Sequence, residues 1–151
     1  MSLADFVGRY RFVGGAKQRN QVTAAIDRSA ASVSFLFRGI ARSKLSDASE
    51  VPDPVEIRVR DGELTIRRGL QIMRGSVGRA TQGYNAREGE QVTVSYRRTG
   101  NRLIEVADSK RGERRTVYVL DQAKGTLQLR ISLTSPHMEI PLRYTLSYRR
   151  L

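Results

Sequence analysis

The sequence predicts an all-β protein: an antiparallel up-and-down β-barrel of about ten strands, with a helix-turn-helix lid between the first and second strands. Three observations predict this fold class. Apolar and polar residues alternate along most of the chain, which is the period-two pattern of strands with one buried face. Turn signals recur about every dozen residues from Gly89 onward. Only one segment, about 16–46, has the apolar spacing of amphipathic helices.

The first strand is predicted over residues 5–13, where alternation places Tyr10 and Phe12 on one face before Gly14-Gly15 ends the pattern. Apolar residues then recur at helix spacing in two groups, Val22, Ala25 and Ile26, and Val33, Leu36, Phe37 and Ile40. We therefore expect two helices, over about 17–29 and 32–45, each with one core-facing stripe. A proline-containing loop follows them.

After Pro54 the pattern is that of strands throughout. Alternating runs on both sides of Asp61-Gly62 predict a hairpin, because this dipeptide favours a tight turn between strands. The least regular segment, 70–88, is interpreted as two strands around Ile72–Val77 and Thr81–Ala86. Further strands are predicted over 92–96, 103–107, 116–120, 127–134 and 140–149, separated by turns at Gly100, Gly112, Gly125 and Pro136. An open meander of about ten strands would leave exposed edges, so we expect the sheet to close.

Length and composition are those of one globular domain spanning residues 1–151, with 39% apolar and 28% charged residues. No apolar run reaches the ~18 residues of a membrane-spanning helix. The N-terminus lacks the pattern of a signal peptide, so we expect the cytoplasm. The leading Met-Ser-Leu could replace a removed signal, which leaves the periplasm or secretion as alternatives.

Metal and cofactor sites are not indicated. Cysteine is absent, and the single histidine, His137, lies in a predicted turn without a cluster of other ligands around it. We interpret His137 as a solvated turn residue and expect no metal and no cofactor.

The opening residues Phe6-Val7-Gly8-Arg9-Tyr10-Arg11-Phe12-Val13 resemble the first strand of the intracellular fatty-acid-binding proteins, Phe-Val-Gly-x-Trp-x-Leu-Val. A helix-turn-helix, a proline and an Asp-Gly hairpin follow in the family's order, and Tyr148 matches the tyrosine of its terminal Arg-x-Tyr. The chain is thus similar to a fatty-acid-binding-protein-like member of the calycin group, which includes lipocalins. The resemblance implies a monomeric, non-catalytic carrier of a small hydrophobic ligand, either a fatty acid or another lipid-like molecule.

The resemblance also implies where a ligand would lie. If Tyr148 points inward, strand parity gives a set of ligand-binding candidates. These are Tyr148, Leu146, Tyr144, Leu142, Val119, Val117, Arg115, Ile131, Leu129 and Phe37. The alternative is that these side chains simply pack as core. Arg115 could reach inward to an acid group or be solvated.

One departure from the family concerns the ligand's charge. Family members hold a fatty-acid carboxylate with an arginine of the eighth strand and with the arginine and tyrosine of the last. Counting along this sequence places Val119 and Leu146 at the two arginine positions, so only Tyr148 is kept. We therefore expect this anion clamp to be missing.

The net charge of +12 favours an anionic partner, either a membrane surface or nucleic acid. We predict that basic residues of the helical lid contact anionic membranes: Lys17, Arg19, Arg28, Arg38, Arg42 and Lys44. The alternative is ordinary surface charge. Most of the excess is arginine at alternate strand positions, which is typical of a solvated outer face.

Nucleic acid is the second class of partner, because Tyr84, Tyr96 and Tyr118 could stack on bases among the arginines. It is the less favoured class, since the tyrosines mostly share the parity of the apolar face. Catalysis is not expected either, because no phosphate-binding glycine loop and no metalloprotease or nucleophile-elbow motif is present. Glu105 lies between Leu103 and Ala107 in an apolar run, and we interpret it as an inward carboxylate in a water network.

Overall fold

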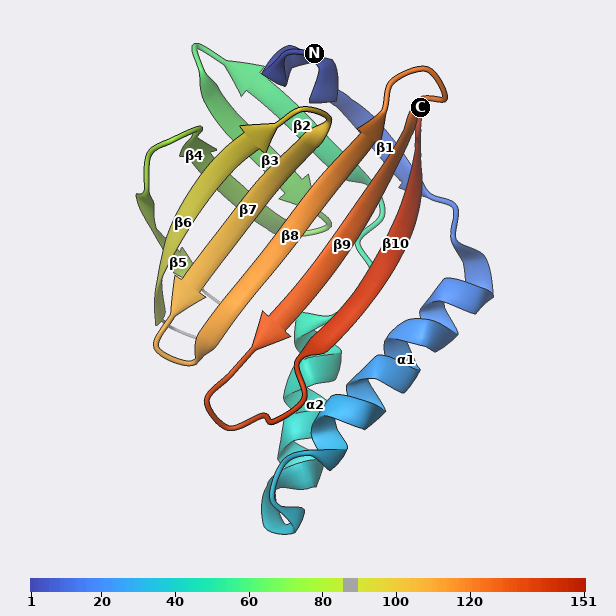
Figure 1. Ribbon diagram of the computed structural model, residues 1–151, viewed down its shortest axis with the longest axis vertical. Helices are drawn as coiled ribbons and strands as arrows, with labels where there is room; N and C mark the ends of the chain where they lie inside the picture. The colour runs from blue at the N-terminus through green and yellow to red at the C-terminus, as the bar shows by residue number, and fades with distance from the viewer. Residues whose placement is uncertain (86–89) are drawn as a thin grey trace.

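The computed structural model describes residues 1–85 and 90–151, and the side chains of residues 1–83 and 90–151. Within that part of the chain, ten antiparallel strands form one sheet that curls into a nearly closed barrel, with two α-helices between the first two strands (Figure 1). The strands are β1 (Gly8–Phe12), β2 (Val55–Arg60), β3 (Glu63–Arg68), β4 (Gln71–Ser76), β5 (Thr81–Asn85), β6 (Glu90–Thr99), β7 (Arg102–Ser109), β8 (Gly112–Asp121), β9 (Thr126–Thr134) and β10 (Leu142–Arg150). The helices are α1 (Gly15–Ala31) and α2 (Arg38–Ala48), with short 3-10 turns η1 (Leu3–Phe6) and η2 (Phe35–Phe37). The predicted fold class is confirmed.

The sheet order is β4-β3-β2-β1-β10-β9-β8-β7-β6-β5, so the barrel closes where β4 and β5 meet. Past the end of β4 the chain reaches β6, because the Gly78 N–H donates a hydrogen bond of 2.9 Å to the Tyr96 carbonyl. Within β4, a Cβ on Gly75 would lie 2.8 Å from the Tyr96 ring. A glycine at position 75 therefore lets β4 approach β6 closely at the seam.

Helix α1 covers part of the edge of β10. Strand β1 pairs with β10 only between Tyr10↔Arg150 and Phe12↔Tyr148, which leaves most of that edge without a neighbouring strand. The Gln18 side chain bonds both groups of Ser147: its Oε1 accepts from the backbone N–H (2.7 Å) and its Nε2 donates to Oγ (2.8 Å). Figure 1 shows α1 running beside β10. The helix thus satisfies and shields an edge that would otherwise be open.

The predicted stripe of α1 is confirmed as core-facing. Val22, Ala25 and Ile26 are buried and belong to the same apolar cluster as the interior of the barrel. The helix therefore packs its apolar face against the barrel, as the spacing predicted.

The second predicted stripe is wrong for most of its residues. Helix α2 begins at Arg38 rather than at residue 32, after the turn η2. Val33 is buried, but Leu36, Phe37 and Ile40 are 81%, 57% and 57% exposed. The reason is their position: the turn between the helices lies at the end of the molecule away from the barrel, where no strand lies beneath it (Figure 1).

The predicted strands of the irregular segment correspond to β4 and β5. Ala86, the expected end of the second of these strands, and the expected turn at Gly89 lie outside the described residues. The last strand begins at Leu142 rather than at residue 140. Ile140 precedes it and is bound to the helices instead, because its N–H donates to Ser32 Oγ (3.2 Å).

Candidate binding site inside the barrel

The interior of the barrel is lined by side chains that the strand registers place in rows. One row runs across five neighbouring strands: Tyr96 pairs with Glu105, Glu105 with Thr116, Thr116 with Ile131, and Ile131 with Tyr144. All five are buried. Since directly opposite residues share a face, these five side chains form one belt around the inner wall, four of them polar. We call this row the polar belt.

Apolar rows lie next to the polar belt. The adjacent row holds Leu103, Tyr118, Leu129 and Leu146, all fully buried. In the next row, Leu120 is opposite Leu127, and Leu127 is opposite Tyr148. These rows of the inner wall are therefore apolar except at the hydroxyl ends of their tyrosines.

Six of the predicted lining residues face this interior. On β10 and β9 the buried residues are Leu142, Tyr144, Leu146, Tyr148, Leu129 and Ile131. Their alternation in sequence was unambiguous, since polar residues separate them at every second position. The inward orientation is confirmed; their role in binding a ligand stays a prediction.

The predicted orientation of β8 is wrong. Thr116 and Tyr118 are buried, whereas Val117 and Val119 are only half-buried and Arg115 is exposed. Arg115 instead approaches the exposed Glu113, with its Nε 3.8 Å from Oε1. Residues 116–120 offer apolar side chains at both parities, so counting from a turn fixed the wrong face, and a slip of one residue inverts the whole strand.

Phe37 was also predicted to line the ligand site, and the structure contradicts this. It lies in η2 at the turn between the helices and is 57% exposed. Its spacing in sequence suggested a helical core position, but the residues around it form a 3-10 turn beyond the end of the barrel (Figure 1).

The polar belt contains one half of a buried ion pair. Arg68 on β3 reaches across the interior, and its Nη1 lies 2.5 Å from Glu105 Oε1. The same Nη1 donates to the Tyr118 hydroxyl (2.5 Å), and the Tyr96 hydroxyl donates to Glu105 Oε2 (2.6 Å). The Arg68 and Glu105 side chains are 3% and 1% exposed. These four residues form a continuous chain of charge-assisted hydrogen bonds, Tyr118–Arg68–Glu105–Tyr96, in the middle of the barrel.

An inward Glu105 was predicted from the sequence, whereas an inward Arg68 was not. The signal was present, because Arg68 continues the alternation of Leu64 and Ile66 on β3 at the apolar parity. A single charged residue at an inward-facing position near the end of a strand is usually solvated. Two opposite charges at inward parity on different strands would have indicated a pair.

Burial and the neighbouring charges together shift the pKa values of the residues in this network. Burial alone would lower the pKa of Arg68, but the Glu105 carboxylate more than offsets this, so its pKa is raised. Burial raises the pKa of Tyr96 first, and the neighbouring Glu105 raises it further. Burial also raises the pKa of Tyr118, although Arg68 opposes the shift. The network therefore holds an arginine cation and two neutral phenols at all ordinary pH values.

Several polar atoms of the interior have no hydrogen-bond partner among the described residues. They include Thr116 Oγ1 and Tyr144 Oη of the polar belt, and the Nε atoms of Arg68 and Arg114. A buried polar group without a partner costs about 1–3 kcal/mol. A ligand or an ordered water in the interior could remove that cost.

The structure also bears on the anion clamp that the resemblance implied. Leu146 is buried and apolar, and Val119 faces outward, so neither position supplies a cation to the interior. The Tyr148 hydroxyl donates to the Pro52 carbonyl (2.7 Å), and its ring packs edge-on against Phe12 at 5.6 Å between centroids. Burial raises the pKa of Tyr148. Tyr148 thus tethers the loop before β2.

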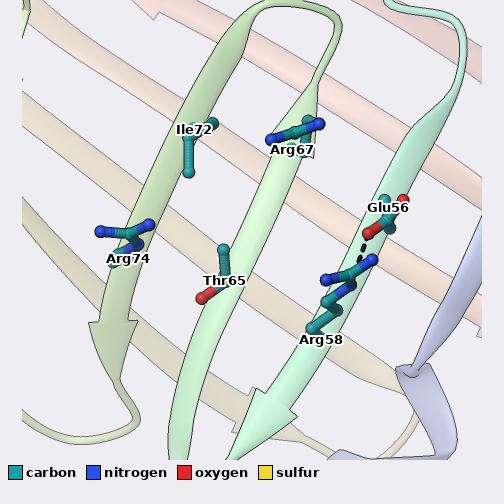
Figure 2. A pocket seen from close by; sticks show the side chains of 6 residues that line it. All are labelled: Glu56, Arg58, Thr65, Arg67, Ile72 and Arg74. Carbon is teal, nitrogen blue, oxygen red and sulfur yellow. Dashed lines mark ion pairs between the residues drawn. The ribbon is translucent and has the colours of Figure 1, made fainter.

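A hollow of about 150 Å³ lies on the outer face of β2, β3 and β4. Figure 2 shows its lining side chains, which are Glu56, Arg58, Thr65, Arg67, Ile72 and Arg74. Thr65 is directly opposite Arg58 on one side and Arg74 on the other, so the small residue leaves room between two arginines. Arg58 Nε is 2.5 Å from Glu56 Oε1. The hollow is polar and outside the wall, so it is separate from the interior.

A second hollow, of about 330 Å³, lies at the end of the barrel between the β7–β8 turn and Thr134–Pro136. His137 follows it in an exposed turn. Among the described residues, no group of three or more histidine and carboxylate side chains could hold a metal ion.

The six basic residues predicted to contact membranes are all exposed on the helices or η2–α2 turn: Lys17, Arg19, Arg28, Arg38, Arg42 and Lys44. Arg42 is paired with Asp27 at 3.1 Å. Four exposed apolar residues that were not predicted to be exposed, Phe35, Leu36, Phe37 and Ile40, form a surface that we call the helical tip. Arg38 lies beside it, with its guanidinium 5.9 Å from the centre of the Phe35 ring, whereas Arg19 lies over Phe12 of β1. Within the described residues, no helix has the length and apolar character needed to cross a membrane.

The sequence matches no protein-family model, and no curated protein matches it. Solved structures do match over the whole chain. A fatty-acid-binding protein of Schistosoma mansoni in complex with arachidonic acid is 12% identical, with a TM-score of 0.60 over 100% of this chain and 99% of that one. Wild-type fluorescent protein UnaG is 17% identical, with a TM-score of 0.62 over 99% and 100%.

Fatty-acid-binding protein 1 of Echinococcus granulosus is 10% identical, with a TM-score of 0.62 over 99% of both chains. At these identities the likeness establishes a shared fold. The fold that the opening strand and the strand order indicated is therefore confirmed, and the chain is built like the fatty-acid-binding proteins along its entire length.

Proposed function

We propose that this protein binds and carries a small hydrophobic ligand, a fatty acid or another lipid-like molecule, in the interior of its barrel without catalysing a reaction. The observation that carries the proposal is the inner wall: continuous apolar rows on β8, β9 and β10 beside a polar belt with unpartnered hydroxyls. Barrels of about eight strands can already hold one small ligand, and this barrel has more strands. The expected state is a monomer, and the expected compartment is the cytoplasm.

The likeness to solved structures supports this proposal. The Schistosoma mansoni protein with the same fold was solved in complex with arachidonic acid, and another match is a fatty-acid-binding protein isolated from Manduca sexta. An apolar lining with a few polar groups that orient the ligand is the usual composition of small-molecule sites.

The route into the barrel involves movement of side chains. The two hollows described above lie outside the inner wall. We infer that a ligand enters between the inward side chains, with rotation of the lining tyrosines or a movement of the helices. Because the chain has six tyrosines and no tryptophan, binding should change its tyrosine fluorescence.

Native mass spectrometry of the gently purified protein tests the proposal. We expect a population heavier than the chain by one small molecule, and lipid extraction should release that molecule. A protein that carries nothing, and that also fails to bind a fluorescent lipid probe in titration, would exclude the carrier function.

Contact of the helices with membranes is the finer part of the proposal. The helical tip exposes Phe35 and Leu36 at 79% and 81%, next to exposed basic residues of both helices. Apolar side chains enter the interface of a bilayer while each nearby Lys or Arg contributes about 1 kcal/mol at an anionic surface. The test is to measure the rate at which the protein transfers a fluorescent lipid to vesicles. A transfer rate that changes neither with the content of anionic lipid nor with the salt concentration would exclude membrane contact.

The alternative function is binding of nucleic acid or another anionic partner on the outer face. The outer hollow supports it, because Arg58, Arg67 and Arg74 surround Thr65 (Figure 2). Against it, Tyr96 and Tyr118 are buried in the network and cannot stack on bases, and the side chain of Tyr84 lies outside the described residues. Filter binding to single-stranded DNA would separate the two functions, since phosphate binding weakens steeply as salt rises.

A further inference from the structure

We infer that the interior of the barrel selects a neutral lipid with a hydrogen-bonding head group, such as a long-chain alcohol, over a carboxylate of the same chain. The inference rests on the proposed carrier function and names its ligand class. It follows from how the charges of the interior are paired.

The central cation of the interior is already neutralised. Arg68 is held by Glu105 at 2.5 Å, and both side chains are almost completely buried. A carboxylate that approaches Arg68 also approaches Glu105, so attraction and repulsion largely cancel. Burying a carboxylate without a compensating charge is strongly unfavourable.

The network leaves little of Arg68 for a ligand. Its Nη1 contacts both Glu105 and Tyr118, and its Nη2 donates to Gln71 Oε1 (3.3 Å). Only Nε has no partner among the described residues. The end-on pair of Nη1 and Nη2, one of the two edges through which a guanidinium can hold a carboxylate, is therefore occupied by the protein's own groups.

A second inward-parity arginine, Arg114, is bound to the lid. Its Nη1 donates to the Ala48 carbonyl at the end of α2 (2.7 Å), where the helix terminus carries partial negative charge. Its Nε is buried and has no partner among the described residues. Arg114 is the residue at which an anionic head group would compete with the neutral ligand, so the experiment has to include it.

The unpartnered hydroxyls supply the recognition. Thr116 Oγ1 and Tyr144 Oη belong to the polar belt, both side chains are more than nine-tenths buried, and neither has a partner among the described residues. A hydroxyl can donate and accept, so together they can bind an alcohol, ester or amide head group in either direction. The apolar rows beside the belt would then hold the chain.

The experiment compares cis-parinaric acid with the corresponding alcohol, two fluorescent probes that share a chain and differ in head-group charge. We expect the wild-type protein to bind the alcohol about ten-fold more tightly than the acid. Glu105→Gln leaves Arg68 charged without its counter-ion, and should shift the preference toward the acid by about ten-fold or more. Glu113→Gln removes a carboxylate from the outer face of β8 and should leave the preference unchanged.

If Glu105→Gln does not fold, the inference can still be tested, because the relative affinity of the wild-type protein for the two probes is measured without any variant. The double variant Arg68→Gln/Glu105→Gln is neutral at both positions and should keep the wild-type preference. Tighter binding of the acid by the wild-type protein would overturn the inference and leave the carrier function standing. If Arg114→Gln then abolished that preference, the head group would be assigned to Arg114. Failure to bind either probe would overturn the carrier function itself.

Discussion

Arg68 on β3 and Glu105 on β7 form an ion pair of 2.5 Å across the interior of the barrel, between strands that are not neighbours in the sheet. Removing both charges from water is costly, and their attraction offsets that cost only in part. The pair is therefore a weak source of net stability. Its consequence is that the two walls are linked and the centre of the barrel is electrically neutral.

Breaking this pair from one side should be strongly destabilising. We expect Arg68→Met to lower the free energy of unfolding by about 3–5 kcal/mol, because Glu105 is left buried without a counter-charge. Replacing both residues, as in Arg68→Met/Glu105→Leu, should restore most of the loss, since no buried charge remains. Urea unfolding measures both values.

The matched control for that comparison is the surface pair of exposed Arg58 and half-buried Glu56, also at 2.5 Å. Arg58→Met should change the free energy of unfolding by less than about 1 kcal/mol, because solvent screens the pair. Equal losses for Arg68→Met and Arg58→Met would contradict the buried, coupled character of the network.

Stability should fall at alkaline pH. Burial raises the pKa values of Tyr96, Tyr118 and Tyr148 above the tyrosine value of the unfolded chain, about 10. The stabilisation from keeping these phenols neutral is complete below about pH 10 and is lost as the pH rises from there toward the folded-state values. Each tyrosine contributes a slope of about 1.4 kcal/mol per pH unit in that range.

Urea unfolding between about pH 8 and pH 11 measures this slope, and phenolate absorbance reports the same titration. Tyr118→Phe should reduce the pH dependence of the free energy of unfolding by the contribution of one tyrosine, about 1.4 kcal/mol per pH unit. A free energy of unfolding that stays flat over this range would show that the three tyrosines ionise as readily in the folded protein as in the unfolded chain.

The contact of α1 with the edge of β10 depends on Gln18. Gln18→Ala removes two hydrogen bonds to Ser147 and should lower the free energy of unfolding by about 1–2 kcal/mol. Amide hydrogen exchange at Ser147 should become faster as well. Gln21→Ala, at an exposed position of the same helix, is the control and should leave both quantities unchanged. Unchanged exchange at Ser147 in Gln18→Ala would mean that α1 does not protect this edge.

The helical tip should affect membrane binding without affecting the fold. Phe35→Ser/Leu36→Ser should change the free energy of unfolding by less than about 0.5 kcal/mol, because both side chains are exposed. Affinity for anionic vesicles should fall by about a hundred-fold or more, since burying each of the two large apolar side chains in the interface is favourable by about 1.5–3 kcal/mol and every 1.4 kcal/mol is ten-fold.

Leu70→Ser is the matched control for the tip, because Leu70 is an exposed apolar residue in the turn between β3 and β4. It should leave vesicle affinity unchanged. The membrane-contact proposal fails if the tip variant and the Leu70 variant bind vesicles as the wild type does.

The sequence was sufficient for the fold where one face of a strand was clearly apolar. On β9 and β10, Leu129 and Leu146 alternate with polar residues, and their inward orientation followed directly. On β8, aliphatic and aromatic side chains such as Val117 and Tyr118 stand at both parities, so alternation could not identify the buried face. Only the pairing of Tyr118 with Leu129 settles it.

The polar network was predictable only in part, because the alternation places Arg68 and Glu105 at inward positions of their strands but does not show that they touch. Arg68 and Glu105 are 37 residues apart, and nothing local to either one shows that the barrel brings them together. The exposed tip was missed because Leu36 and Ile40 have helical spacing, and spacing alone does not reveal whether a partner surface lies opposite.

Photo-crosslinking tests most directly whether the barrel interior is the ligand site. A long-chain probe with a photoreactive diazirine is bound, irradiated and mapped on the chain by peptide mass spectrometry. The account predicts labels on inward residues of β9 and β10, above all Leu129, Tyr144 and Leu146. Labels confined to the outward Val117 and Val119, or to the tip residues Phe35–Phe37, would contradict it.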